Sequence, residues 1–303
     1  MTPLLSHLRI AFVGFLMGCA DVVPGVSGGT IAFICGIYER LLNGIKSFDI
    51  TSLKLVFQGD FKGVWARIPF PFFIALGFGL LTAVLTLAKV LEHFMTSYPA
   101  QLWSFFFGLV LGSIVLLGRK TWAWKPLDWV TFFGFGGATF VLVGLQTLQT
   151  PDGLPFVFIA GAIAICAMIL PGISGSYLLV IMGKYATVIE AVNDRDVVTV
   201  AVFCAGIATG VLSFVRVVSW LLNQHRHVTL IALTGAMAGA LRTLWPWKKT
   251  LTTRVNSSDE VVPLTQANIM PGAESNLLLA VGLAVVGGIA VLLIERLAKA
   301  EES

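Results

Sequence analysis

The chain has 303 residues, of which 57% are hydrophobic and 12% are charged, and its formal net charge is +4. A soluble domain carries about 25% charged residues, so this composition excludes an ordinary water-soluble protein. Apolar runs of about 18 residues or more recur, which predicts an all-α polytopic membrane protein. A β-barrel is excluded because its strands alternate apolar and polar residues. The few basic residues gather in loops, so we expect contact with membrane lipids and none with nucleic acid.

Apolar runs divide the first half of the chain, residues 1–150, into a hairpin and three spans. The hairpin consists of two apolar arms around a helix-breaking turn, and a polar connection separates it from the spans. The hairpin covers about residues 8–45, and the spans cover about 71–94, 103–117 and 129–148.

The second half, residues 151–303, repeats this order within what we expect to be a single membrane domain. Its longest polar loop, 246–275, precedes the last span. The hairpin covers about residues 155–192, and the spans cover about 197–222, 228–245 and 276–297.

The two halves share residues at a series of corresponding positions in the same order, which indicates an internal duplication. Pro24-Gly25-Val26-Ser27-Gly28 returns 147 positions later as Pro171-Gly172-Ile173-Ser174-Gly175. Glycines of the later spans match at an offset of 127, where Lys89 falls opposite Arg216. Each half crosses the membrane an odd number of times, whether its hairpin re-enters or both arms span. We therefore expect the second half to be inverted relative to the first.

Loop charges predict the orientation. With the N-terminus placed inside, eleven loop Lys and Arg residues fall on that side and four on the other. Both termini are therefore expected to be cytoplasmic. Inverted halves with interrupted helices are typical of secondary transporters, whose binding sites lie near the middle of the bilayer.

The two turns contain the most direct candidates for chemistry. Ser27 and Ser174 occupy the positions where an N-cap opens the second arm, so the N–H groups that follow are expected to be unpaired and able to bind an anion. In the alternative interpretation the serines cap their own helices and the turns only close the hairpins. The candidate anion-binding residues are Ser27, Gly28, Gly29, Thr30, Ser174, Gly175 and Ser176.

Ionisable residues inside membrane segments are functional candidates by default. Asp21 and Glu39 either form structural hydrogen bonds or carry ions coupled to transport. Lys89 and Arg216 either extend to the headgroups or offer a cation in each leaflet to an anionic headgroup. Two further candidate anion-guiding residues on the second arms are Arg40 and Lys184.

Other patterns carry less information. Gly25-Val26-Ser27-Gly28-Gly29 matches the nucleophile elbow of hydrolases, but that motif needs a preceding strand and acid and His partners, so we do not expect an enzyme. Two GxxxG patterns, which begin at Gly108 and Gly235, predict close helix packing within the fold or in a homodimer. All four cysteines lie in apolar segments without a Cys-x-x-Cys pair, and we expect no metal and no cofactor. They are Cys19, Cys35, Cys166 and Cys204.

The region around the first turn resembles the signature of a bacterial family long catalogued only as a domain of unknown function and now associated with PopT-type polyprenyl-phosphate transporters. The resemblance extends over nearly the whole chain, including the second turn. The run that carries it is Met17-Gly18-Cys19-Ala20-Asp21-Val22-Val23-Pro24-Gly25-Val26-Ser27-Gly28-Gly29-Thr30-Ile31-Ala32-Phe33, which continues to Gly36-Ile37-Tyr38-Glu39-Arg40-Leu41.

This resemblance implies that the chain moves undecaprenyl phosphate, the lipid carrier of cell-wall precursors, from the outer to the inner leaflet of the bacterial cytoplasmic membrane. We expect alternating access, with the phosphate bound at the two turns and the isoprenoid tail left in the lipid. Two alternatives remain: a transporter of small anions, and an intramembrane lipid phosphatase. The scarcity of histidine argues against the phosphatase.

Overall fold

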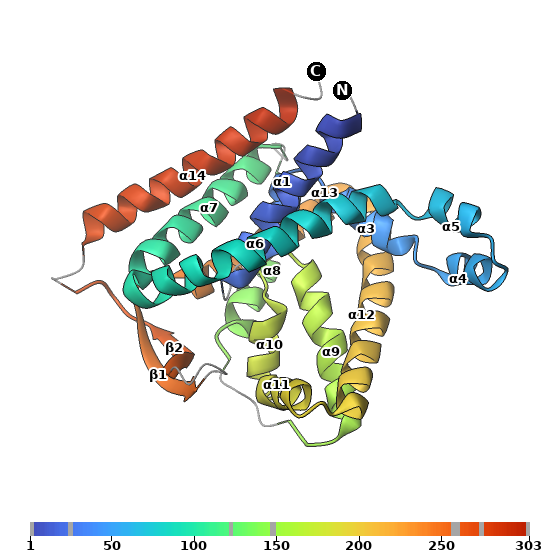
Figure 1. The fold of residues 1–303 in the computed structure, drawn as a ribbon. Helices are drawn as coiled ribbons and strands as arrows, with labels where there is room; N and C mark the ends of the chain where they lie inside the picture. Colours follow the sequence, from blue (N-terminus) through green and yellow to red (C-terminus); the bar gives the residue numbers. More distant parts are fainter. Residues whose placement is uncertain are drawn as a thin grey trace.

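The computed structural model describes residues 3–23, 27–120, 124–145, 150–255, 261–272 and 276–300. Helices dominate these residues (Figure 1). The first half contains α1 (Pro3–Val22), α2 (Gly28–Ile34), α3 (Tyr38–Lys46), α4 (Ile50–Phe57), α5 (Phe61–Arg67), α6 (Phe70–Ser97), α7 (Pro99–Lys120) and α8 (Pro126–Leu142). The second half contains α9 (Leu154–Ile169), α10 (Gly175–Ile181), α11 (Tyr185–Asn193), α12 (Val197–Gln224), α13 (Arg226–Ala240), the 3₁₀ turn η1 (Leu241–Leu244), β1 (Lys248–Val255), β2 (Val261–Asn268) and α14 (Leu277–Ala300).

Six helical segments in the described part of the chain are long and apolar enough to cross a membrane, so this is a multi-pass membrane protein. The pair α10 and α11 gives a seventh if it is counted as one broken span, because its two helices meet at an angle of 106°. The six segments are Leu5–Val22, Phe70–Leu87, Pro99–Arg119, Val197–Gln224, Arg226–Leu244 and Leu277–Arg296.

Five of the six predicted spans are confirmed as long apolar helices, and two elements differ from the prediction. The first arm is longer than expected, because α1 has 20 residues and reaches the length of a span. The predicted span at 129–148 is shorter: α8 has 17 residues and ends at Leu142. Gly144 follows after the C-cap residue Val143, and helices commonly end close to a glycine.

The predicted all-α fold needs one correction. The long polar loop of the second half contains an antiparallel pair of strands, β1 and β2, in which Lys248 lies opposite Asn268 and Val255 opposite Val261. This loop is rich in threonine and valine, whose branched side chains favour a pleated backbone over a helix. The hydropathy pattern of the membrane spans does not reveal a strand pair of this kind.

Four pairs of long helices form the frame of the molecule: α1 with α6, α9 with α12, α7 with α14, and α8 with α13. In the first pair the backbones approach so closely that a Cβ on Gly79 would overlap the carbonyl oxygen of Ala11. In the second pair a Cβ on Gly206 would overlap the carbonyl oxygen of Phe158. These two contacts are related by the same offsets, 127 and 147 residues, that relate the two halves in sequence.

The third span of each half packs against the opposite half. A Cβ on Gly108 of α7 would overlap the carbonyl oxygen of Ala284 in α14, and a Cβ on Gly235 of α13 would overlap that of Phe132 in α8. Both GxxxG patterns therefore pack against helices of the same chain. They serve the fold, and they are not free to form a dimer interface.

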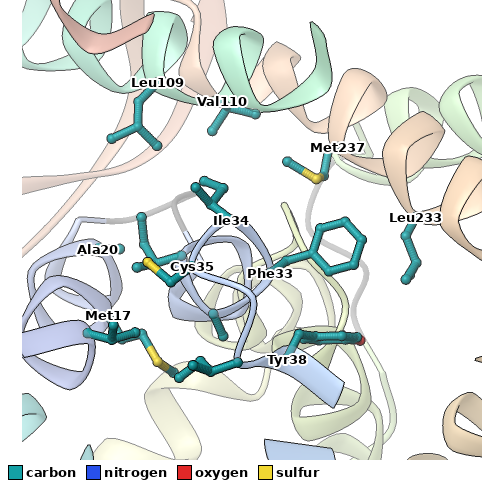
Figure 2. Close-up of a cluster of buried hydrophobic side chains, with 14 of the residues drawn as sticks. Met17, Ala20, Phe33, Ile34, Cys35, Tyr38, Leu109, Val110, Leu233 and Met237 are labelled. Carbon is teal, nitrogen blue, oxygen red and sulfur yellow. The ribbon is translucent and has the colours of Figure 1, made fainter. Parts of the chain in front are cut away.

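The main hydrophobic core surrounds the short helix α2 (Figure 2). Met17 of α1, Val110 of α7 and Met237 of α13 lie around Ile34. The helix that follows the first turn is thus covered by elements of both halves. Few of its side chains reach solvent, since six of its seven residues are buried.

Candidate functional site

Both turns precede a helix, as predicted, but each of these helices is short. Ser27 is the N-cap of α2 and Ser174 occupies the N-cap position of α10. The helices α1 and α9 end just before the two turns, and each turn thus interrupts an apolar hairpin. Residues 24–26, which the first motif also includes, lie outside the described residues.

The first turn is closed by groups of the protein itself. The N–H of Gly28 donates to Oδ1 of Asp21 at 2.7 Å, and the N–H of Gly29 donates to Oγ of Ser27 at 3.1 Å. The N–H of Thr30 donates to the backbone oxygen of Ser27 at 2.9 Å. The expectation of unpaired N–H groups is therefore wrong here. Asp21 lies near the end of α1, and its carboxylate occupies the place where an anion would bind.

The first turn also touches the end of α9, in the other half. Oγ of Ser27 donates to the carbonyl oxygen of Met168 at 3.3 Å, and the hydroxyl of Tyr38 donates to that of Ile169 at 3.1 Å. These carbonyls belong to the last turn of α9, which has no later helical N–H groups to bind. These two hydrogen bonds join residues that are 141 and 131 positions apart in sequence, and they bring the two turns together.

The second turn is open. Ser174 makes no capping bond, and its hydroxyl pairs instead with that of Ser176 at 2.9 Å. Within the described residues, no acceptor is found for the N–H groups of Gly175 and Ser176. Ser176 is exposed and Ser174 is half-buried, whereas Pro171, Ile173 and Gly175 are buried, as Ser27 is. The two related turns therefore differ in their hydrogen bonds: the first turn is sealed by its own groups, and the open second turn leaves its first N–H groups without an acceptor among the described residues.

Each second arm is interrupted once more, where we expected a continuous helix. Gly36 has a φ of +73° and Gly183 a φ of +67°, in the left-handed region that favours glycine. The breaks separate α2 from α3 and α10 from α11. The two glycines match at the offset of 147, so the repeat already contained the signal for both breaks.

One buried threonine stands out beside the first turn. Thr30 is 0% exposed, and its hydroxyl has no hydrogen-bond partner among the described residues. It lies in the first turn of α2, next to the bonds that seal this helix. A buried hydroxyl without a partner is costly, which makes this position sensitive to rearrangement of the turn.

The predicted charged residues lie in several places. Glu39 pairs with Arg226 of α13 at 2.7 Å, so its partner is not the neighbouring Arg40. The guanidinium of Arg40 lies over the ring of Phe72, 4.6 Å from its centre. Glu39 thus links the first hairpin to the second half, and the cation on Arg40 is held by an aromatic face.

Lys184 is 2% exposed, and its Nζ donates to Oδ1 of Asp152 at 2.9 Å. Lys89 and Arg216 occupy equivalent positions on α6 and α12, which have 28 residues each. Both side chains are exposed. The structure thus leaves these two cations outside the contact between the turns.

Arg242 was not identified from the sequence. Its Nη1 donates to the carbonyl oxygen of Phe140 at 3.0 Å, and the hydroxyl of Tyr177 donates to that of Val143 at 2.7 Å. A basic residue at the end of α13 and a tyrosine just after the second turn therefore converge on the end of α8. The signal was present, since Arg242 is a cation within an otherwise apolar predicted span.

Comparison with known proteins agrees with the resemblance found in the sequence. A polyprenyl-phosphate transporter of Vibrio cholerae serotype O1 is 45% identical over 269 residues, 88% of this chain and 87% of the relative. A polyprenyl-phosphate transporter of Staphylococcus aureus is 29% identical over 257 residues, 77% of this chain and 84% of the relative. Both relatives are named as transporters, not as enzymes. No solved structure gives a significant match.

The family comparison covers both turns. The model of the VCA0040-like family, described as undecaprenyl phosphate translocase-like, matches residues 17–262. This stretch runs from the end of α1 into β2 and includes most of the frame of paired helices. The chain therefore belongs to the VCA0040-like family of undecaprenyl phosphate translocase-like membrane proteins.

Proposed function

We propose that this protein moves undecaprenyl phosphate from the outer to the inner leaflet of the bacterial cytoplasmic membrane, where the lipid is reused to carry cell-wall precursors. The names of the family and of two relatives support this class of substrate. One structural observation carries the mechanism: of two related turns in contact with each other, the first is sealed and the second is open. In alternating access, each conformation has one closed side and one open side, and this difference between the turns fits that requirement.

We infer that residues 1–150 and 151–303 are inverted repeats. The helix contacts that recur at the sequence offsets support the duplication, as does the equal length of α6 and α12. If each half crosses the membrane an odd number of times, the second half is inverted relative to the first. The chain then ends on the same side of the membrane on which it began. In Figure 1 the start of α1 and the end of α14 lie at the same end of the molecule, which agrees with this count. The distribution of positive loops supports a cytoplasmic position for that end.

The second conformation follows from the repeat. The offset of 147 residues relates Ser27 to Ser174 and Tyr38 to Tyr185. In the opposite arrangement, Ser174 and Tyr185 bind the carbonyl groups at the end of α1, and the first turn opens. Inverted repeats exchange their conformations in this way, so one set of contacts serves both faces of the membrane.

In the conformation described, the phosphate binds at the second turn. The hydroxyls of Ser174 and Ser176 and the N–H groups of Gly175 and Ser176 are available to it. At the first turn Asp21 already occupies the N–H of Gly28. Phosphate reaches this turn only when that carboxylate moves away or takes up a proton, which gives Asp21 a role in ion coupling. In that conformation the phosphate binds Ser27, Gly28, Gly29 and Thr30.

Four further cations lie outside the turns. Lys89 and Arg216 guide the headgroup along α6 and α12. Lys184 and Arg40 are held by Asp152 and by an aromatic ring, so they take part only after these contacts break. Glu39, paired with a cation of α13, is the second candidate for ion coupling.

The test removes the hydroxyls of both turns by the double substitution Ser27→Ala with Ser174→Ala. Cells that carry it are expected to accumulate undecaprenyl phosphate in the outer leaflet, as measured with a lipid-binding probe outside the cell. Ser113→Ala is the control, because this buried hydroxyl bonds only within its own helix. Normal recycling with normal expression would rule out the turns as the phosphate site.

A transporter of small anions is the remaining alternative, since the same turns bind free phosphate as well. The protein reconstituted in vesicles separates the two functions. Uptake of inorganic phosphate that added undecaprenyl phosphate does not inhibit would favour the small anion. Movement of the labelled lipid that inorganic phosphate does not inhibit would favour the lipid.

A further inference from the structure

A groove of about 690 Å³ opens between the helical hairpin α4–α5 and α12. This volume is within the range of small-molecule sites, which is about 300–1,000 Å³. The walls are mostly apolar and include Leu53 and Val56 of α4 and Ile68 after α5. Three polar side chains line the groove: Asp49, Ser52 and Arg216.

Two of these three polar groups already have partners. The carboxylate of Asp49 accepts the N–H of Ser52 and pairs with Arg67. These bonds lower the pKa of Asp49 to about 2 and keep it ionised. The hydroxyl of Ser52 donates to the carbonyl oxygen of Ser47 at 2.6 Å. Arg216 is the third polar group, and among the described residues it has no ion-pair partner.

Arg216 lies well inside the membrane-spanning helix. At about 1.5 Å per residue, the 28 residues of α12 measure about 42 Å, longer than a hydrocarbon core of about 30 Å. Arg216 precedes the last residue, Gln224, by eight positions, or about 12 Å. Its Nη1 donates to the carbonyl oxygen of Leu212, one turn closer to the middle of the helix. The side chain thus does not extend toward the nearer end of α12, where the headgroups of that leaflet lie.

No acidic residue neutralises this cation in the part of the chain that the structure describes. Among the described residues, Arg216 forms a hydrogen bond only to its own helix. A guanidinium at this depth, beside an apolar groove, is costly unless an anion reaches it. The groove therefore combines an apolar wall with an unmatched positive charge.

The hairpin that forms the other wall has no counterpart in the second half. Residues 47–69 separate α3 from α6, whereas only residues 194–196 separate α11 from α12. The hairpin projects from the body of the molecule in Figure 1. Its aromatic side chains are exposed: Phe57 by 82%, Phe61 by 72% and Trp65 by 58%. Exposed aromatic residues of this kind are typical of a segment at the membrane interface.

We propose that this groove, in the leaflet that we assign to the cytoplasm, is the lateral exit site for the lipid: the isoprenoid chain of a polyprenyl phosphate lies between α4–α5 and α12, and its phosphate pairs with Arg216. This inference rests on the proposed function and adds a second binding position outside the turns. The apolar wall selects a molecule with a hydrocarbon chain. A phosphate monoester can bind a guanidinium through two parallel hydrogen bonds. A zwitterionic phospholipid brings its own cation and matches Arg216 less well.

The experiment measures binding of undecaprenyl phosphate to the full-length, detergent-solubilised protein by native mass spectrometry. Arg216→Ala is expected to weaken binding by about tenfold or more, because it removes a charge-assisted hydrogen bond. Val56→Trp fills the groove and is expected to reduce binding similarly. The matched controls are Lys54→Ala and Phe57→Trp, on the same hairpin but outside the groove lining, and both should bind as the unmodified protein does.

Unchanged binding in both groove variants overturns the proposal, and so does equal competition by phosphatidylglycerol, which identifies an ordinary membrane lipid as the occupant. Thermal unfolding checks that each variant is folded, and Leu53→Trp replaces Val56→Trp if the latter is not. The two proposals fail differently. If the unmodified protein does not bind undecaprenyl phosphate, the proposed function fails. If it binds and transports the lipid while the groove variants do so equally well, only the exit site fails.

Discussion

Tyr38→Phe with Ser27→Ala removes the two hydroxyls that attach the first turn to the end of α9. Tyr38 is 2% exposed and donates to Ile169 at 3.1 Å, and the buried Ser27 donates to Met168 at 3.3 Å. Both bonds cross between the halves. In the proposed alternating access, they are present in the conformation with a sealed first turn and absent from the opposite one.

A buried neutral hydrogen bond contributes about 1 kcal/mol net, so the loss of both favours the opposite conformation by about 2 kcal/mol. This corresponds to roughly a 30-fold change in the equilibrium between the two conformations, and Tyr38→Phe alone corresponds to about fivefold. Ser27→Ala also removes the capping bond from Gly29 to Ser27, which the open second turn lacks. Its loss acts in the same direction, so the 30-fold change is a lower limit.

Thr30→Cys reports this equilibrium in a chain whose four native cysteines are replaced by serine. Thr30 is fully buried, so a water-soluble maleimide reacts only with molecules whose first turn has opened. The labelling rate is expected to rise about fivefold with Tyr38→Phe and about 30-fold or more when Ser27→Ala is added. Ser113→Ala serves as the control within a single helix. Equal labelling in the double variant, or an equal rise in the control, refutes the role of these hydroxyls.

Two further predictions concern stability. Gly79→Ala is expected to lower the free energy of unfolding by about 1–3 kcal/mol or more, because its Cβ overlaps the α1 backbone. Gly77→Ala is the control and should cost little, because the space around Gly77 is open. Thermal unfolding of the two variants in detergent tests this, and equal melting temperatures would contradict it. Burial lowers the pKa of Lys248 from 10.5 to about 7. Unfolding therefore takes up a proton between these pH values, so the free energy of unfolding rises with pH across this window. Lys248→Met should remove that rise when melting temperatures at about pH 7 and pH 9.5 are compared. If the melting temperature of the variant still rises with pH, Lys248 is not the source.

The membrane spans could be predicted because hydrocarbon length and helix rise relate an apolar run directly to a crossing. The turns could be predicted because proline, glycine and serine interrupt such runs for local reasons. The breaks at Gly36 and Gly183 also have a local cause, but each lies inside an apolar run that reads as one long arm. They become visible only when both copies of the repeat are read for positions that glycine alone fills easily.

The closed state of the first turn could not be predicted. It depends on Asp21 reaching the N–H of Gly28 across a bend, and the second turn has Met168 at the equivalent position. The groove beside Arg216 was beyond prediction for a similar reason. Its walls come from segments more than 140 residues apart, and no periodicity relates them.

The third span of each half packs against the opposite half, and this arrangement has a consequence for biogenesis. The face of α7 that contains Gly108 packs against Ala284 of α14, which is synthesised 176 residues later. At about 5–20 residues per second, the ribosome needs roughly 10–35 seconds to supply that partner. During this interval a strip of small residues on α7 faces lipid or a foreign helix. Assembly in the membrane is therefore completed only when the last helix enters, and a chain released before α14 leaves the first half without its cover.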